Sequence, residues 1–227
     1  MQWVESSIKQ IGGPDCYEAM RICELAARTC YRSEDQITHT SAGKLITSCL
    51  RKGHESVIEH VQLNFEIVCD RATSHQWVRH RLSSYSQESQ RYCNYTKEKF
   101  NNEIVFVRPE WTKDLNTGVW ASNDPLVIQE NLLNNACSVA EKAYFEMIKN
   151  GAKPEQARAI LPNCVKTQFV WSANMREIRH FIKLRATKNA QPEIRKLAIK
   201  LYDILQHEGY GAFLVDIEVY NDKCVAN

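Results

Sequence analysis

The sequence predicts an α+β fold, in which a mixed sheet packs against helices within a single domain over residues 1–227. Residues 61–69 alternate apolar and polar side chains, as expected for a strand with one buried face. Residues 15–31 instead place their apolar side chains on one helical stripe. Strands and helices intermix without regular alternation, which favours α+β over a parallel α/β fold. A chain of this length suits one domain, and no linker composition interrupts it.

Three helices are predicted in the first half of the chain. The first covers residues 15–31. The second starts at Ser41 as its N-cap and stops at Gly53, since serine caps helices and glycine ends them. The third follows the strand directly, because Asp70 is a suitable N-cap, and it runs to about Arg79.

Polar segments separate these helices from the rest of the chain. Residues 54–60 are a short polar stretch with two histidines, and residues 82–95 are rich in Ser, Gln and Tyr without periodicity, which indicates a loop. In the second half, a proline and a glycine frame a long helix at 125–150. Further helices are expected at 154–160, 174–185 and 193–207, and further strands at 104–107, 165–171 and 213–219.

Charge and cysteine content argue against several classes of protein. The chain carries 29 basic and 27 acidic residues, whereas a general nucleic-acid or membrane-surface binder needs a strong basic excess. Its nine cysteines are scattered and odd in number, so we expect reduced thiols and not a secreted disulfide framework. The N-terminus lacks the build of a signal peptide, and no apolar run is long enough to span a bilayer. We therefore expect a cytoplasmic protein without a membrane partner.

Neither of the glycine-rich loops that commonly hold phosphates is present in this chain. Any bound nucleotide must therefore be held by side chains, and arginine suits this role because its planar guanidinium bonds phosphate oxygens in pairs. Residues 79–92 supply three arginines and a histidine, together with serine, glutamine and tyrosine side chains. From the residues alone, this segment is either a nucleotide site or a solvated helix end with a polar surface loop.

The same segment also fits a different class of function, an RNA or single-strand nucleic-acid binding module. Arginines and aromatic rings together form a surface of cations and stacking platforms. The residues concerned are Arg79, Arg81, Arg91, Tyr85, Tyr92 and Tyr95. The near-neutral net charge weighs against this alternative.

A longer pattern in this region resembles a known family. Arg79-His80-Arg81, seven intervening residues, Ser89 and then Arg91-Tyr92 resemble the signature of the flavin-dependent thymidylate synthases. Other segments resemble further parts of that family, in the family's order. They are Gly53–His60, Ala157–Pro162, Asn174–Arg176 and Leu184–Ala186.

The resemblance implies a methyltransferase and oxidoreductase reaction that makes dTMP from dUMP. Methylenetetrahydrofolate gives the one-carbon unit, FAD carries the hydride, and NADPH is the reductant. The redox chemistry belongs to the flavin, while the protein supplies binding, orientation and electrostatics. The resemblance also implies a homotetramer with shared active sites and no nucleic-acid partner.

Site residues follow from the positions that match the family. The resemblance assigns FAD contacts to Ser56, Arg79, His80, Arg81, Gln87, Asn174, Arg176 and His180. It assigns the dUMP site to Gln76, Arg79, Gln87, Glu88, Ser89, Gln90, Arg91, Arg158 and Arg185. Arg185 is expected to be the catalytic residue, since a guanidinium stays charged and stabilises the ionised uracil ring. Ser89 is expected to bind the substrate by hydrogen bonds and not to act as a nucleophile.

Three positions depart from what some family members carry. Gln87 stands where some have glutamate, His180 where some have asparagine, and Asn189 where some have histidine. These differences affect individual contacts and not the reaction. The histidines of the chain match no common metal-ligand spacing, so we expect no metal ion.

Overall fold

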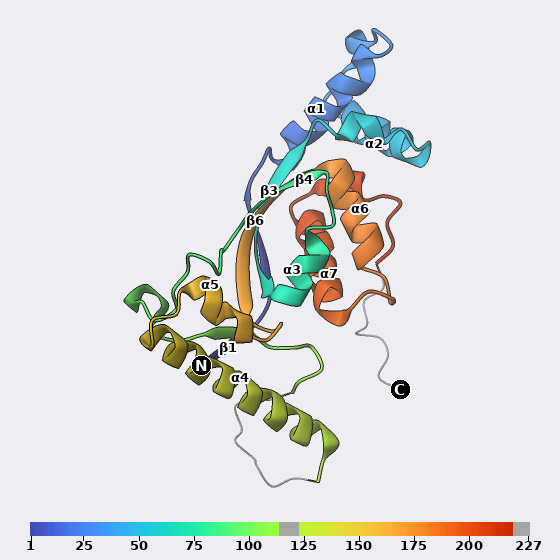
Figure 1. Ribbon diagram of the computed structural model, residues 1–227. Helices are drawn as coiled ribbons and strands as arrows, with labels where there is room; N and C mark the ends of the chain where they lie inside the picture. The colour runs from blue at the N-terminus through green and yellow to red at the C-terminus, as the bar shows by residue number, and fades with distance from the viewer. Residues whose placement is uncertain (114–122, 220–227) are drawn as a thin grey trace. The chain divides into compact units, whose positions relative to one another are not determined.

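The computed structural model describes residues 1–113 and 123–219, and these residues form two compact units. Unit 1 comprises Met1–Ser7, Val68–Gln76 and Ser86–Phe169. Unit 2 comprises Ile8–Ile67, Trp77–Tyr85 and Val170–Asn227. Strands β3 (Gln62–Asp70) and β6 (Lys166–Asn174) each contribute residues to both units. Helices and strands mix as the α+β prediction requires (Figure 1).

A four-stranded sheet has the order β2-β3-β6-β4, where β2 is Ser7–Gly12 and β4 is Ser83–Gln87. The buried residues of β3 alternate with partly exposed ones along the strand, which confirms the strand predicted from the 61–69 pattern. The strand predicted at 165–171 is also confirmed, and it continues to Asn174. A second sheet pairs β1 (Gln2–Val4) in parallel with β5 (Val105–Val107).

Unit 1 is built on the long helix α4 (Pro125–Lys149). Asp124 caps the helix by accepting a hydrogen bond from the Leu126 N–H at 2.9 Å, and Gly151 follows its end at φ +90°. Helix α4 contributes Cys137 and Tyr144 to the core of the unit. The other core residues are Tyr95, Ile104, Phe106, Ala157 and Val165. The remaining elements are η3 (Glu98–Phe100), α5 (Pro154–Ala157), η4 (Arg158–Ile160) and most of α3 (Arg71–Trp77).

Aromatic rings form the centre of unit 2. Trp77 stacks on Phe181 with ring centroids 4.3 Å apart, and Trp171 meets the edge of Trp77 at 5.4 Å. Phe65 lies 5.7 Å from Trp171, and all four side chains are fully buried. Rings packed in offset and edge-to-face geometry add to the stabilisation from burial alone.

The helices of unit 2 form two pairs. Helices α6 (Met175–Arg185) and α7 (Pro192–His207) pack against each other, as do α1 (Cys16–Thr29) and α2 (Ser41–Arg51) (Figure 1). The short helices are η1 (Glu34–Gln36), η2 (Glu55–Ile58) and η5 (Tyr210–Phe213). No helix in residues 1–113 or 123–219 combines the length and apolar character that crossing a membrane would need.

The helix predictions are confirmed with small shifts of their ends. The Asp70 side chain caps α3 by accepting from the Thr73 N–H at 2.8 Å, as predicted. Helix α2 begins at Ser41, so its N-cap is Thr40 and not Ser41 itself. Every cysteine within the described residues is a free thiol, as expected, and Cys224 lies outside them.

Two predictions are wrong and two strands are missed. Residues 82–95 are not all loop, since β4 forms within them as a neighbour of β6. Polar side chains stand on both faces of β4, so the apolar alternation that marks a strand is absent. The expected strand at 213–219 is absent, because the chain ends η5 there and continues without regular structure. Strands β1 and β2 are short, and their pattern is too weak to find in the sequence.

Candidate functional site

A cavity of about 380 Å³ opens in unit 2 between the turn after α3 and one face of α6. The turn contributes Arg79, His80, Arg81 and Leu82, while α6 contributes Glu177, His180, Leu184 and Arg185. Two segments that the sequence predicted as ligand-binding, 79–81 and 174–185, therefore meet at one site. Their arginine and histidine side chains make this cavity a site for an anionic or polarisable ligand.

Tyr85 of β4 holds the turn after α3 in place. Its hydroxyl donates to the backbone carbonyls of Trp77 at 3.0 Å and of His80 at 2.7 Å. Burial raises the pKa of Tyr85 to about 12, so the hydroxyl keeps its proton at neutral pH. Arg79 and Arg81, which flank His80 in this turn, stay exposed to solvent.

Asn174 sets the start of α6, as the sequence predicted. Its side-chain oxygen accepts a hydrogen bond from the backbone N–H of Glu177 at 2.9 Å, and the Met175 N–H donates to the carbonyl of Val61 at 2.8 Å. This cap places Glu177 in the first helical turn, where its side chain is buried. The positive end of the helix dipole lies at the same point.

His80 is buried and hydrogen-bonded on both ring nitrogens. Its Nδ1 lies 3.1 Å from Oε1 of Glu177, and its Nε2 accepts from Nε of Arg185 at 3.2 Å. Phe181 meets the ring edge-on at 4.9 Å, and the His180 ring lies 5.5 Å away. The sequence predicted His80 as a flavin contact, but both of its ring nitrogens already have partners within the chain.

Burial, together with the nearby Arg185 and His180, lowers the pKa of His80 to about 4. The ring is therefore neutral at physiological pH, and its contact with Glu177 is a hydrogen bond from a neutral imidazole and not an ion pair. Burial also raises the pKa of Glu177, against an opposing effect of His180. Together with His180, these residues place three potential ligand atoms within 4.8 Å of one another, and two of them, on His80 and Glu177, are already joined by a hydrogen bond.

The lowered pKa of His80 predicts an acid-sensitive fold. The unfolded chain takes up this proton near pH 6.5 and the folded chain only near 4, so stability is lost as pH falls from about 6.5 to about 4 and is unaffected above that window. Replacing His80 with Gln removes this contribution. Urea midpoints measured at pH 5 and pH 7.5 should therefore differ less in His80→Gln than in the wild type. The exposed His207→Gln variant is the control, and an unchanged difference in His80→Gln would contradict the prediction.

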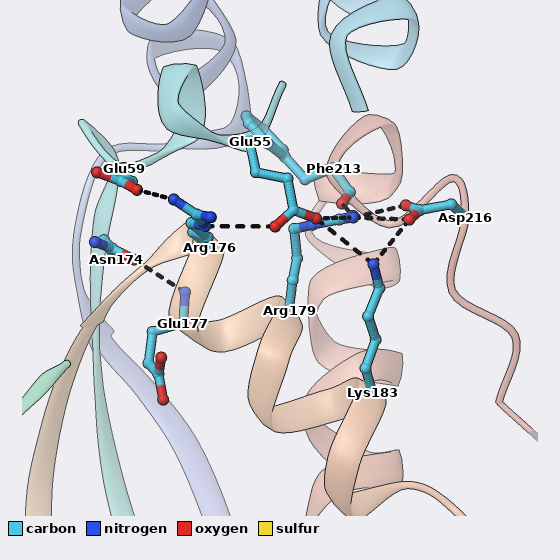
Figure 2. A network of polar contacts seen from close by, with 9 residues as sticks. All are labelled: Glu55, Glu59, Asn174, Arg176, Glu177, Arg179, Lys183, Phe213 and Asp216. Atoms are coloured by element: carbon cyan, nitrogen blue, oxygen red, sulfur yellow. Dashed lines mark hydrogen bonds and ion pairs between the residues drawn. The ribbon is translucent and has the colours of Figure 1, made fainter. Parts of the chain in front are cut away.

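A network of ion pairs runs along α6 from Arg176 through Arg179 to Lys183 (Figure 2). Arg176 donates to Glu59 at 2.5 Å and lies 3.5 Å from Glu55, and the side chains of Arg176 and Glu59 are both about half exposed. Glu55 is the first residue of η2 and Glu59 follows its end, and η2 also carries the exposed Ser56. Ser56 and Arg176, both predicted FAD contacts, therefore belong to one surface region.

Arg179 is the buried centre of this network, with 1% of its side chain exposed. It donates to both carboxylate oxygens of Asp216 at 2.8 and 2.9 Å, to Glu55 at 3.0 Å, and to the carbonyl of Phe213. Lys183 bridges Asp216 and Glu55 from outside (Figure 2). Helix α6 thereby joins η2 to the segment after η5.

None of the acids in these two clusters was predicted from the sequence. Arg176, Arg179 and Lys183 recur at helical spacing and so mark one polar face of α6. That spacing was a usable signal for an acidic partner. The acids that pair with this face of α6, Glu55 and Asp216, lie far away in the sequence, so no local pattern identifies them.

Most predicted dUMP contacts lie in unit 1. Gln87 donates to the hydroxyl of Thr167 at 3.1 Å. The Glu88 backbone N–H donates to the carbonyl of Gln168 at 2.8 Å, and its carboxylate accepts from Lys166 and Tyr95 at 3.1 and 3.2 Å. Glu88 is therefore a structural residue within the unit, with 15% of its side chain exposed.

The segment after Glu88 is less fully bonded. The carbonyl of Ser89 accepts from the N–H groups of Tyr92 and Cys93, which forms a turn. Side-chain Nε2 of Gln90 is buried and has no hydrogen-bond partner in the part of the chain that the structure describes. Arg91 is exposed, lies over the Tyr92 ring at 5.4 Å, and is 3.5 Å from Glu155.

The predicted site residues therefore fall into two groups. Unit 2 brings together Arg79, His80, Arg81, His180 and Arg185 at its cavity, and places Ser56, Asn174 and Arg176 around the start of α6. Unit 1 contains Gln76, Gln87, Glu88, Ser89, Gln90, Arg91 and Arg158, with Gln76 on α3 and Arg158 on η4. Asn189 lies exposed in the turn after α6.

Comparisons with known proteins agree with the sequence pattern. Residues 15–208 match the model of the family described as thymidylate synthase complementing protein. The flavin-dependent thymidylate synthase of Geobacter sulfurreducens is 33% identical over 80% of this chain and 75% of its own length. Those of Pyrococcus furiosus and Pyrococcus abyssi are 37% and 40% identical, over 75% and 66% of this chain. The matched region spans 65% and 57% of these two relatives. Because the family model covers most of the chain, the chain belongs to the flavin-dependent thymidylate synthase family of enzymes.

Proposed function

We propose that this chain is a thymidylate synthase that makes dTMP from dUMP, with FAD as hydride carrier. Methylenetetrahydrofolate is the one-carbon donor and NADPH the reductant. The observation that supports this most directly is the unit 2 cavity, where Arg185 is oriented by a neutral, buried histidine within a family-matching sequence.

The cationic lining of the unit 2 cavity suits an anionic cofactor. Among the described residues that line it, Glu177 is the one acid, and its carboxylate already bonds His80. Arg79 and Arg81 are exposed at its mouth, where their guanidinium groups suit phosphate oxygens. Ser56, Asn174, Arg176 and His180 would supply further FAD contacts in unit 2, and the resemblance to the family also assigns Gln87 to FAD. When bound, FAD supplies the hydride-transfer chemistry that no side chain of the protein offers.

The substrate residues divide between phosphate and base. Arg91 and Arg158 carry the charge that a phosphate needs, and Ser89 and Gln76 add neutral hydrogen bonds. The Nε2 donor of Gln90 supports a polar ligand, since a buried amide without a partner is costly. Arg185 stabilises the negative charge that develops on the pyrimidine ring, because its guanidinium stays protonated.

The competing nucleic-acid function is weakened by the state of its tyrosines. A stacking platform must present its ring face to solvent. Tyr95 is 6% exposed and packs against Phe100 and Tyr144, and the hydroxyl of Tyr85 is held by two backbone carbonyls. Of the three proposed rings, only Tyr92 is widely exposed.

Assembly and location extend the same proposal. The chain would act as one domain in a homotetramer with shared active sites, in the cytoplasm and without a resident metal ion. Light scattering of the purified protein tests the assembly. A stable monomer would leave the shared-site arrangement without support.

The purified protein itself tests the reaction. We expect a yellow protein with flavin absorbance, which releases tritium from dUMP labelled at C5 when NADPH and methylenetetrahydrofolate are both present. Omitting either co-substrate should stop the release. A protein that takes up no FAD and releases no tritium would overturn the proposal.

The ion pair of Arg176 predicts a variant with tighter flavin binding. Glu59 occupies the guanidinium that a flavin phosphate would use, so Glu59→Gln should lower the Kd for FAD. Both side chains are about half exposed, and pairs of this kind contribute up to about 1 kcal/mol, so we expect a two- to fivefold decrease. Quenching of flavin fluorescence on titration with the protein measures the Kd for FAD. Glu34→Gln, which makes the same charge change on η1, should leave the Kd unchanged, and weaker binding in Glu59→Gln would contradict the competition.

A further inference from the structure

We propose that Glu177 is a positioning residue that acts through the His80 ring to hold the guanidinium of Arg185 in its working orientation. The inference rests on the proposed function, because the orientation of Arg185 matters only if this residue acts on the substrate. The hydrogen bonds show that the orientation exists. Neither the family pattern in the sequence nor the matching segments single out Glu177. Its carboxylate, the His80 ring and the Arg185 guanidinium form a continuous chain along one wall of the unit 2 cavity.

The direction of each hydrogen bond follows from Arg185. An arginine Nε can only donate, so Nε2 of His80 must accept at 3.2 Å. A neutral imidazole with a bare Nε2 carries its proton on Nδ1. That Nδ1–H then donates to Oε1 of Glu177 at 3.1 Å, and the carboxylate must accept. Glu177 therefore stabilises, from the Nδ1 side, the one neutral tautomer of His80 that can accept from Arg185.

The low pKa of His80 keeps this chain in its neutral form. With burial and Arg185 both disfavouring a second proton, the ring stays an acceptor on its Nε2 side throughout the neutral range. The Arg185 guanidinium is thus held by a lone pair and not repelled by an imidazolium.

Two members of the relay, His80 and Glu177, are also held by contacts outside it. Phe181 packs edge-on against the His80 ring at 4.9 Å, and Tyr85 holds the His80 carbonyl at 2.7 Å. Glu177 is 5% exposed, and its backbone N–H is bonded by the Asn174 cap (Figure 2). A ring held on its faces and at its backbone transmits the choice of tautomer to Arg185 without rotating away.

Glutamine at position 177 keeps the shape of the side chain, but unlike a carboxylate it is not limited to accepting a hydrogen bond from His80. Its amide can present the oxygen, which leaves the ring proton on Nδ1, or the NH₂ group, which requires Nδ1 to accept and moves the ring proton to Nε2. Nε2–H would then face Nε–H of Arg185, and two donors at 3.2 Å repel each other. Arg185 must turn away from the ring in that state, and its guanidinium leaves the cavity wall.

The experiment compares the wild type with Glu177→Gln, and with Glu24→Gln as a matched control. Glu24 is also a buried carboxylate of unit 2, and its Oε1 lies 2.8 Å from Nε of Arg28. Neither residue lines the unit 2 cavity. Nitrogen NMR of ¹⁵N-histidine-labelled, flavin-free protein reports the His80 tautomer, with the His80 signal identified by its absence from His80→Asn. Steady-state tritium release reports kcat and the KM for dUMP.

We expect the wild type and Glu24→Gln to carry the His80 proton on Nδ1, and Glu177→Gln, which no longer fixes the tautomer from the Nδ1 side, to carry part of it on Nε2. The kcat of Glu177→Gln should fall about 10- to 100-fold, as when an orienting partner of a functional histidine is lost, with KM for dUMP within about threefold. A purely structural role would lower the amount of folded enzyme and leave the tautomer and the kcat per folded site unchanged. An unchanged tautomer or a kcat within twofold of the wild type would overturn the proposal.

The two readouts separate this proposal from the proposed function. If the wild type makes no dTMP, the proposed function fails, and the tautomer shift alone decides the relay. If Glu177→Gln does not fold, the nitrogen NMR spectrum of the wild type still tests the relay, because it shows which nitrogen of His80 carries the proton. A His80 proton found on Nε2 in the wild type would overturn the relay without any variant.

Discussion

Replacing Arg185 with Lys is expected to lower dTMP formation by about 100- to 1000-fold, the loss typical when one preorganised donor to a developing anion is removed. Lysine keeps the positive charge but has no Nε–H for His80 and no planar guanidinium to meet the pyrimidine ring of the substrate. In the wild type, the 3.2 Å hydrogen bond to His80 fixes the plane of that group. A flexible ammonium at the end of α6 would be positioned far less well.

Rapid-quench measurement of tritium release in a single turnover gives this effect without a contribution from product release. The flavin absorbance of Arg185→Lys should remain close to that of the wild type, because Arg79, Arg81 and Arg176 are unaltered. Arg21→Lys is the control, since Arg21 lies on the exposed face of α1, paired with Glu18. A rate for Arg185→Lys within about threefold of the wild type would show that charge alone suffices at this position.

Local patterns explain why so many elements were predictable. Strand β3 alternates buried and solvent-facing residues because one face meets the core, and this alternation is directly visible in the sequence. Asp70, Asp124 and Asn174 cap the helices that follow them, since short polar side chains satisfy the first free N–H groups of a helix. Strand β4 escaped prediction because it is defined by its neighbour β6 and not by its own side chains.

The arginines and histidines that line the unit 2 cavity were easier to find in the sequence than the acids that hold them. The arginines of the 79–91 segment follow from the absence of glycine-rich phosphate loops and from the family pattern. Glu177 and Asp216 carry no such mark, because their roles depend on partners 97 and 37 residues away in the chain. A burial pattern alone would even have argued against an acid at position 177. What the sequence could not provide was the pairing of distant charges that makes such burial tolerable.

Replacing Arg179 with Met is expected to destabilise the fold by about 2–4 kcal/mol. Breaking a fully buried ion pair typically costs about 3–5 kcal/mol because the remaining charge is stranded. The cost should be lower here, since Asp216 and Glu55 are 31% and 25% exposed and Lys183 stays within 2.9 Å of Asp216. Urea unfolding followed by circular dichroism measures the free energy of unfolding.

Arg176→Met is the matched control, because it makes the same chemical change one helical turn earlier on α6. Its partners are about half exposed or only partly buried, so the expected loss is below about 1 kcal/mol. A double-mutant cycle of Arg179→Met with Asp216→Asn should give a coupling energy of about 1–2 kcal/mol. A coupling near zero would mean that Lys183 alone holds Asp216. The guanidinium of Arg179 would then be retained for its bonds to Glu55 and the Phe213 carbonyl, which tie η2 and η5 to the same helix that carries Arg185.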